Sequence, residues 1–188
     1  MRIIAGKYKG RILKTGFGPG YRPATGKVRE SLFSMLESLG LAWRETNVLD
    51  VFAGSGSLGF EALSRGCVRV VFVEKSASAC RVLRENICRL GVRGECSINQ
   101  KDALAFLAAP GSVPFGLVFA DPPYGKDLAK PALALLTKNW LLPGGFLCAE
   151  TEAGLDIATG FGEQLCLVKD RLFGQTRIYI WQKAEIKR

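Results

Sequence analysis

From residue 47 to residue 150, short apolar runs alternate with segments of helical periodicity. The apolar runs predict five strands, at 47–53, 68–74, 95–100, 115–120 and 145–150. Between them, the amphipathic segments predict helices at 57–66, 76–91, 102–108 and 127–140. Strands that are apolar throughout and alternate with helices are typical of a parallel sheet covered on both faces. The central chain is therefore predicted to be an α/β sandwich.

The two ends of the chain follow other patterns. Residues 2–8 and 11–15 are short β-prone runs that predict a hairpin with Lys9-Gly10 at its turn. A loop rich in Gly and Pro follows, and then a helix over 27–40 that Gly40 ends. The tail, 164–183, has two runs with no helix between them, which predicts an antiparallel pair.

Together these elements predict a seven-stranded, mostly parallel sheet with the last strand reversed, plus an N-terminal β-hairpin. We expect two parts, a basic hairpin and loop at 1–21 and a catalytic domain at 22–188. The chain shows no apolar stretch long enough for a membrane span and no signal peptide, so we expect a cytoplasmic protein without a membrane partner.

Composition narrows the possible chemistry. The chain has no histidine, which excludes Ser-His-Asp and Cys-His catalysis and any His-ligated metal within this chain. None of its six cysteines forms a Cys-x-x-Cys pair, so we expect no metal and interpret the thiols as small buried hydrophobes. Any proton acceptor in a site must then come from another group, such as a carboxylate, a carbonyl or water.

Positive charge is concentrated at the ends of the chain. Residues 1–30 carry eight basic side chains and one acid, whereas residues 31–168 carry twelve basic and fourteen acidic ones. A basic segment beside a near-neutral body favours binding of a polyanion. Lys7, Lys9, Arg11 and Lys14 are the candidates in the N-terminal segment, and a solvated basic tail is the alternative.

A glycine-rich loop follows the first predicted strand of the sandwich. Gly54, Gly56 and Gly59 form Gly-x-Gly-x-x-Gly between a strand and a helix, where ligands bind in α/β sheets. Glu74 ends the next strand and can accept both hydroxyls of a ribose. The ligand is therefore expected to contain adenosine or a related nucleoside, and both NAD and S-adenosylmethionine qualify.

Three further features favour S-adenosylmethionine over NAD. Asp50 lies inside the first strand, where a dinucleotide site usually has an apolar residue, and a buried carboxylate there needs donors or a cation. Asp102 follows the third strand, where it can accept from an adenine amino group. Asp121-Pro122-Pro123-Tyr124 ends the fourth strand, over the methyl-donor end of such a pocket.

The two prolines of that motif explain its chemistry. They have no backbone N–H and fix the chain, while Asp121 is forced toward an extended conformation. The corner therefore presents acceptors without competing donors, namely the Asp121 carboxylate and the Pro122 carbonyl. Both suit the amino group of a nucleobase, whose attack on a methyl donor they would orient. Tyr124 can stack on the base.

Several blocks of the chain carry a resemblance to a known family. RIIAGKYKGR at 2–11, RPATGKVRESLF at 22–33, VLDVFAGSGSLGFEALSRG at 48–66 and DPPY at 121–124 resemble the bacterial small-subunit (16S) ribosomal RNA guanine-N2 methyltransferases, the RsmD-like proteins. The resemblance implies a Rossmann-like class I fold, S-adenosylmethionine as cofactor, and ribosomal RNA or the assembling small subunit as partner. We expect the enzyme to be a monomer. It also implies that Arg22, Pro23, Thr25 and Arg29 border the active site.

The expected site residues fall into three groups. Catalysis is assigned to Asp121, Pro122 and Tyr124. Cofactor contacts are assigned to Asp50, Phe52, Gly54, Gly56, Glu74, Lys75, Asp102, Ala103 and Asp121. Substrate contacts are assigned to Arg22, Thr25, Arg29, Lys7, Lys9 and Arg11.

Three alternatives remain open at this point. The motif Asp-Pro-Pro-Tyr suits an N6-adenine methyltransferase acting on DNA or RNA equally well. A non-catalytic RNA-binding assembly factor could keep the same cofactor fold, and a nicotinamide oxidoreductase could use the glycine loop. Cofactor binding and analysis of the methylated nucleoside would separate them.

Overall fold

The structure is a computed structural model that describes residues 1–16, 26–109, 113–123, 125, 127–158 and 164–185. Its strands are β1 (Asn47–Val51), β2 (Arg69–Val73), β3 (Cys96–Asn99), β4 (Phe115–Ala120), β5 (Leu141–Glu152), β6 (Leu165–Phe173) and β7 (Thr176–Lys183). Its helices are α1 (Gly26–Ser38), α2 (Ser57–Arg65), α3 (Ala77–Leu90), α4 (Ala103–Ala108) and α5 (Ala129–Asn139), with a short 3-10 turn, η1, at Trp43–Glu45.

The strands form one seven-stranded sheet in the order β3-β2-β1-β4-β5-β7-β6. Strands β1 to β5 pair in parallel, whereas β7 runs antiparallel to both β5 and β6. The predicted reversed last strand is therefore confirmed. The strand order changes direction between β1 and β4, which is the position where α/β sheets bind ligands at the carboxyl ends of their strands.

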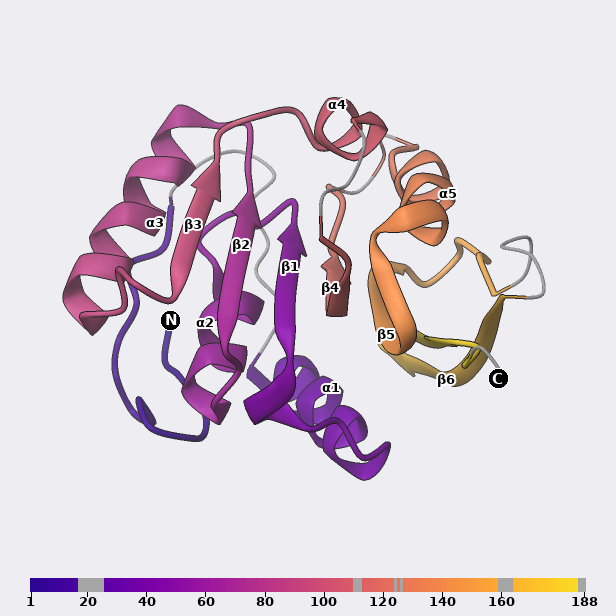
Figure 1. Cartoon of the computed structure of the whole chain (residues 1–188), viewed down its shortest axis with the longest axis horizontal. Helices are drawn as coiled ribbons and strands as arrows, with labels where there is room; N and C mark the ends of the chain where they lie inside the picture. The colour runs from indigo at the N-terminus through magenta and orange to yellow at the C-terminus, as the bar shows by residue number, and fades with distance from the viewer. Residues whose placement is uncertain (17–25, 110–112, 124, 126, 159–163, 186–188) are drawn as a thin grey trace.

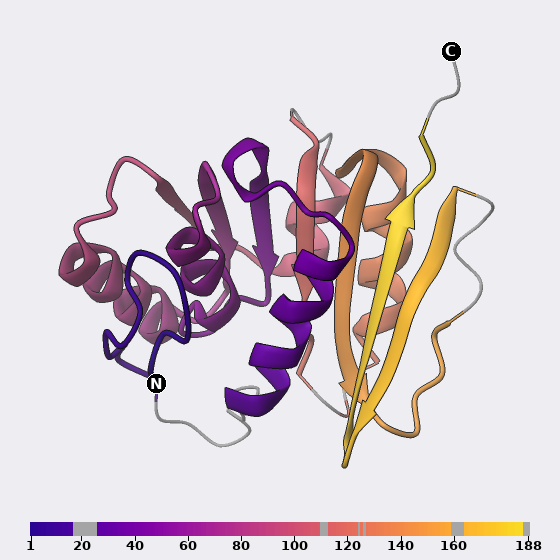
Figure 2. The ribbon, with the colours of Figure 1, turned by 90° about the horizontal axis from the view of Figure 1, so that it is seen from below.

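Each face of the sheet has its own apolar core. Helices α1, α2 and α3 pack on one face, with Phe33, Phe60 and Leu83 fully buried there. Helices α4 and α5 cover the other face, where Leu133 and Trp181 lie in the core. Figure 1 shows the strands between these helices, and Figure 2 shows β6 and β7 closing the far edge of the sheet. Two covered faces explain why the central strands are apolar throughout.

The predicted elements agree with the structure in kind, with small shifts at their ends. Ser76 caps α3 as expected, because its hydroxyl accepts from Ala79 N. Pro131 lies in the first turn of α5, where a missing N–H costs nothing. Strand β5 begins at Leu141, earlier than predicted, and a register shift opposite Phe115 accommodates the extra residues.

The predicted N-terminal hairpin is present but short. Its arms pair antiparallel at one bridge, between Arg2 and Ile12, where Ile3 N donates to Arg11 O at 3.0 Å and Leu13 N donates to Met1 O at 2.7 Å. Beyond this bridge the backbone bonds to α2: Ile4 N and Ala5 N donate to the Glu61 carboxylate at 2.8 and 3.0 Å. Because a helix side chain uses these two donors, the pairing does not extend into a strand ladder.

The N-terminal segment, residues 1–16, is also anchored by burial. Ile3 and Leu13 lie in the core that α1, α2 and α3 form, and a Cβ on Gly6 would overlap the backbone of Ser64. Figure 2 shows the segment beside α2 and α3. The expected domain division at residue 21 lies outside the described residues and stays a prediction, although residues 1–16 share the core of the sheet.

Two expectations from the sequence concern membrane spans and the thiols. Among the described helices, none combines the length and apolarity that a bilayer span requires. Cys67, Cys80 and Cys148 are buried as expected, but Cys88 and Cys166 are exposed. The interpretation of all six thiols as buried hydrophobes is therefore wrong for these two.

Candidate active site

The glycine loop joins β1 to α2 at the centre of the sheet. Phe52, which follows β1, has a φ of 64°, a left-handed conformation that is uncommon for a bulky residue and is found at functional sites. Gly54 also has a positive φ, and its N–H donates to Glu74 Oε2 at 2.9 Å. The loop is therefore held in a fixed shape by the end of the neighbouring strand.

Two glycines of the loop lie close against neighbouring side chains. Gly56 has a φ of 82°, and a Cβ there would lie 2.6 Å from side-chain atoms of Leu83 and Phe60. A Cβ on Gly59 would overlap the Phe72 ring, so this glycine permits close packing of α2 on β2. Gly56 and Gly59 are thus required by packing within the protein, and the prediction that Gly56 faces the ligand is not tested.

Asp50 lies near the centre of the site, on β1, and is 2% exposed. Its Oδ2 accepts from Gly59 N, in the first turn of α2, at 3.0 Å. Burial raises the pKa of the Asp50 carboxyl to about 8; the bond from Gly59 opposes this rise and the charge of Glu74 adds to it. A cation bound nearby would stabilise the charged form of this carboxylate.

Glu74 is half-buried at the end of β2, and both of its oxygens accept backbone bonds. Oε2 accepts from Gly54 and Oε1 accepts from Ser76 N at 2.7 Å. A carboxylate oxygen has a second lone pair, so these bonds fix the orientation of the side chain and leave acceptor capacity for a ribose.

Asp102 begins α4 at the adjacent strand end. One of its oxygens caps the helix by accepting from Leu104 N and Ala105 N, and the other lies 3.9 Å from Lys75 Nζ. Ala103 is buried directly after it. The predicted contact with an adenine amino group would use the oxygen that faces Lys75.

The Asp-Pro-Pro corner extends β4 by one residue, since Asp121 N lies 3.5 Å from Val51 O. Asp121 is half-buried, Pro122 is buried and Pro123 is exposed. Within the described part of the chain, no hydrogen bond reaches the Asp121 carboxylate. The acceptors of the corner are therefore available, because the prolines have no N–H groups that could donate to them.

The surroundings of Asp121 disfavour its charge. Burial, and then the charges of Glu150 and Asp50, raise the pKa of Asp121 well above its usual range. Glu150 is 7% exposed on β5, next to β4, and was not predicted as a site residue. The signal was present in the sequence, because Glu150 ends an apolar run in the same way that Glu74 and Asp121 do.

The predicted substrate residues separate in the structure. Lys7, Lys9 and Arg11 are exposed on the N-terminal segment. Arg29, in contrast, is 3% exposed; it donates to Arg2 O at 2.9 Å and contacts the Met1 sulfur. The expectation that Arg29 contacts the RNA substrate does not fit this burial. Arg29 joins α1 to the start of the chain.

Three predicted residues, Arg22, Thr25 and Tyr124, lie outside the described residues, as does Pro23. In the ranges that the structure describes, no group of three or more His, Cys, Asp or Glu side chains is arranged so that it could hold a metal ion. The described geometry brings together Asp50, Glu74 and Asp121, each at or near the carboxyl end of a strand.

Solved structures place this arrangement in a known class. A structure from Escherichia coli, yhhF, which is provisionally assigned as a methyltransferase, is 32% identical, covers 99% of both chains and superposes with a TM-score of 0.85. The sheet order, the reversed last strand and the loop at the switch point fit the Rossmann-like class I methyltransferases. The protein is therefore a methyltransferase of this class.

Sequence comparison identifies the family. The family model described as "Conserved hypothetical protein 95" matches residues 1–182. "Ribosomal RNA small subunit methyltransferase D" of Haemophilus influenzae is 37% identical over 97% of this chain and 93% of its own length. The protein of the same name from Escherichia coli K12 is 33% identical over 97% and 90%. The chain belongs to this family.

Proposed function

We propose that this protein transfers a methyl group from S-adenosylmethionine to the exocyclic N2 of a guanine in 16S ribosomal RNA. The observation that carries the proposal is the Asp121-Pro122 corner, which presents acceptors beside a glycine loop ordered by Glu74. The names of the relatives at 37% and 33% identity support the RNA substrate. We expect the reaction to occur in the cytoplasm, where ribosomal subunits are made.

The described residues fit S-adenosylmethionine. Its ribose offers two hydroxyl donors, and Glu74 is held in place with acceptor capacity to spare. Its methionine end carries an ammonium group, and the buried Asp50 carboxylate accepts only from Gly59 among the described donors. When bound, this cofactor supplies an electrophilic methyl group.

The corner would act on the nucleophile. The Asp121 carboxylate and the Pro122 carbonyl would accept the two N–H bonds of the guanine amine, whose lone pair then points away from the ring plane. Holding the amine in this way favours attack through orientation and stabilises the positive charge that develops on nitrogen. Both acceptors are in place before the substrate binds, because the prolines fix the backbone.

Asp121 is also suited to receive a proton. Burial and the nearby charges of Glu150 and Asp50 raise the pKa of Asp121, which makes the carboxylate a stronger base than an exposed aspartate. The proton that the methylated amine must lose could therefore move to an oxygen of Asp121. With no histidine in the chain, no imidazole competes for this role.

A direct experiment tests this function. The purified protein is incubated with S-adenosylmethionine labelled in the methyl group and with small-subunit RNA, both naked and in assembled subunits. Digestion to nucleosides should then yield labelled N2-methylguanosine. Labelled N6-methyladenosine would instead identify adenine as the substrate. The absence of a labelled nucleoside from both RNA samples would overturn the proposal.

A further inference from the structure

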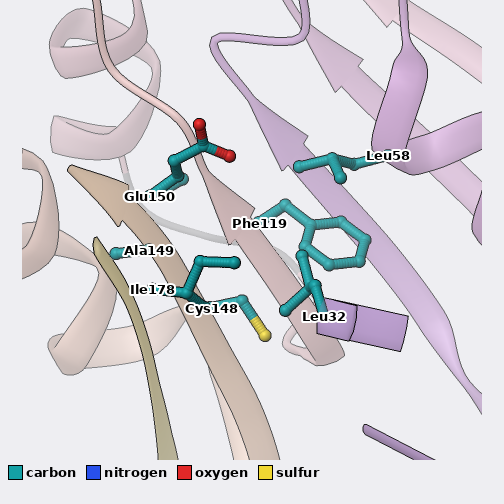
Figure 3. A pocket seen from close by; sticks show the side chains of 8 residues that line it. Leu32, Leu58, Phe119, Cys148, Ala149, Glu150 and Ile178 are labelled. Atoms are coloured by element: carbon teal, nitrogen blue, oxygen red, sulfur yellow. The ribbon is translucent and has the colours of Figure 1, made fainter. Parts of the chain in front are cut away.

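The edge of the sheet that forms the candidate site is acidic or apolar. Four carboxyl groups lie at or near the carboxyl ends of its strands, those of Asp50, Glu74, Asp121 and Glu150. The small pocket beside the corner is lined by Glu150 and otherwise by apolar side chains, as Figure 3 shows. RNA carries a negative charge at every phosphate, and carboxylates repel it. The cations that hold the RNA backbone must therefore lie elsewhere on the protein.

The body of the chain is near neutral in sum, but its charges are segregated. Residues 75–101 carry six basic and two acidic side chains, whereas the rest of residues 31–168 carries six basic and twelve acidic ones. The six basic residues are all exposed, and they are Lys75, Arg81, Arg84, Arg89, Arg93 and Lys101. The near-neutral sum thus hides a basic region that is centred on α3.

Three of these side chains form a row along the helix. Arg81, Arg84 and Arg89, the α3 arginines, have the i, i+3, i+8 spacing of one helix face, and all three are exposed. Leu83 and Leu90, on the other side of α3, are buried in the core. At 1.5 Å per residue, the row is about 12 Å long. The α3 arginines therefore face away from the sheet, toward solvent.

The N-terminal segment is fixed against the same helix. Asn86, which is fully buried on α3, accepts from Lys14 N at 2.9 Å and donates to Lys14 O at 3.0 Å. Lys14 Nζ pairs with Glu85, so one of the two acids of residues 75–101 is already neutralised. Figure 2 shows the segment beside α3. The exposed basic side chains of the segment and the α3 arginines therefore belong to one basic surface.

The strand order places this surface to the side of the reacting base. Strand β4, which ends at the Asp121 corner, is separated from β3 by β1 and β2, and α3 packs on β3. Neighbouring strands lie about 4.8 Å apart, so β3 is about 14 Å from β4 across the sheet. When a base enters at the corner, the RNA can reach α3 only through nucleotides that flank the target.

We propose that the α3 arginines, together with the N-terminal segment, bind the phosphate backbone of the RNA that flanks the target guanine. The proposal rests on the proposed function and adds α3 to the substrate-binding surface. Guanidinium groups suit this task, because their planar fork can donate two hydrogen bonds to one phosphate. Contacts to phosphates position an RNA without reading its sequence, so the choice of base is left to the corner.

The main test removes the three charges of the row. In the triple variant Arg81→Gln, Arg84→Gln and Arg89→Gln, the log–log salt slope for binding small-subunit RNA should flatten by up to about 2–3, or about 0.7–0.9 per lost phosphate contact. The affinity at low salt should fall by about 10-fold or more. In turnover assays the loss should appear in KM, with kcat within about twofold of the parent value, because the corner is unchanged.

The length of the RNA gives a second readout. Once the methylated guanine is mapped, binding is compared between full-length small-subunit RNA and a short RNA that keeps this guanine and only its nearest neighbours. The short RNA does not extend to α3, so the triple variant should bind it as tightly as the parent protein does. The loss of affinity should be confined to the full-length RNA.

Two further triple variants control the result. Arg44→Gln, Lys130→Gln and Lys138→Gln remove the same charge from exposed positions on η1 and α5, and this variant should keep the parental slope. Replacement of the α3 arginines by lysine keeps the charge and should keep most of the slope. Because Arg, Lys and Gln have similar helix propensities, α3 should fold in every variant, which thermal unfolding checks.

The methylation assay tests the proposed function and the salt slope tests the role of α3, so the two can fail separately. If the parent protein methylates guanine but the glutamine variant of the α3 arginines loses no more slope than the control, the α3 arginines are only solvated charge and their role is overturned. An equal loss of affinity for the short and the full-length RNA would overturn it as well. Should the triple variant fail to fold, the single variants Arg81→Gln and Arg89→Gln decide, each with an expected flattening of about 0.7–0.9.

Discussion

The loops after β1 and β4 lie side by side at the switch point and use their backbones in opposite ways. The glycine loop turns its N–H groups inward: Gly54 donates to Glu74 and Gly59 donates to Asp50. The Asp121-Pro122-Pro123 corner has no N–H groups at its prolines, and no described donor reaches the Asp121 carboxylate. One loop uses its polar groups to fix its own shape, and the other keeps them for a substrate.

This difference has a physical reason. A cofactor site must bind in the same way in every cycle, so carboxylates that are fixed by backbone donors are useful there. A nucleophile must be held through its own N–H bonds, and a backbone donor at the corner would compete for the same acceptors. Glycine supplies the first kind of loop and proline the second.

The largest expected effect comes from removing the acceptor of the corner. Asp121→Asn should lower kcat by about 10²–10³-fold, because the amide accepts one bond fewer and cannot take a proton. Cofactor affinity, measured by calorimetry, should change by less than threefold or so. Asp127→Asn is the matched control, since Asp127 is exposed six residues later. Unchanged turnover in Asp121→Asn would remove this residue from the mechanism.

A second test breaks the glycine loop. Gly56→Ala and Gly40→Ala both place a side chain at a φ of 82°, but only at Gly56 would the Cβ meet neighbours. The strain of the backbone is common to both variants, so Gly56→Ala should destabilise by about 1–3 kcal/mol more in denaturant unfolding. It should also weaken cofactor binding. Equal losses of stability would mean that packing does not select this glycine.

The raised pKa of Asp50 predicts how stability depends on pH. The folded pKa of about 8 lies above the unfolded value of 3.8, so the folded state keeps a proton that the unfolded state has lost. The free energy of unfolding should then fall as pH rises from about 5 to 7, by about 1 kcal/mol per unit. The lack of histidine leaves this window clear of the residue that usually titrates there.

Asp50→Asn checks this dependence. The slope should become shallower without vanishing, because Asp121 shifts in the same direction. Asp127→Asn should keep the parental slope. Denaturant unfolding at several pH values measures all three proteins, and a parental stability that rises between pH 5 and 7 would contradict the assignment.

The smallest effect is expected outside both loops. Lys7, Lys9 and Arg11 are exposed, so replacing them with glutamine should leave folding unchanged and weaken RNA binding. The log–log salt slope should flatten by up to about 0.7–0.9 for each RNA phosphate that these side chains neutralise in the parent protein. Lys14 is left in place because it pairs with Glu85. The control is the double variant Lys130→Gln with Lys138→Gln on α5. An unchanged salt slope in the N-terminal variant would mean that Lys7, Lys9 and Arg11 are solvated and neutralise no RNA phosphate.

Local patterns predicted the parts of this protein that depend on near neighbours in the chain. Alternating apolar and amphipathic segments predicted the sandwich, and Ser76 and Pro131 marked helix starts correctly. Carboxylates at strand ends predicted Asp50, Glu74 and Asp121 as one group, because parallel strands end at the same edge. These signals depend on period and position, which the sequence alone contains.

Other features depend on which segments meet in space. The N-terminal hairpin was predicted, but its anchoring was not: two of its backbone donors pair with Glu61, 56 and 57 residues away. Arg29 was expected to contact the substrate, yet it is buried against Met1 and Arg2. Neither outcome has a local signature, because both depend on α1 and α2 packing on the start of the chain.

By itself, the sequence determined the alternating α/β pattern, the glycine loop and an aspartate followed by two prolines that cannot donate. The tertiary structure decided what these elements face. It turned Gly56 and Gly59 toward protein neighbours and placed Glu150 across from Asp121. The pairing of β4 with β5 joins residues about 29 positions apart, and such non-local contacts follow from the packing of the whole sheet.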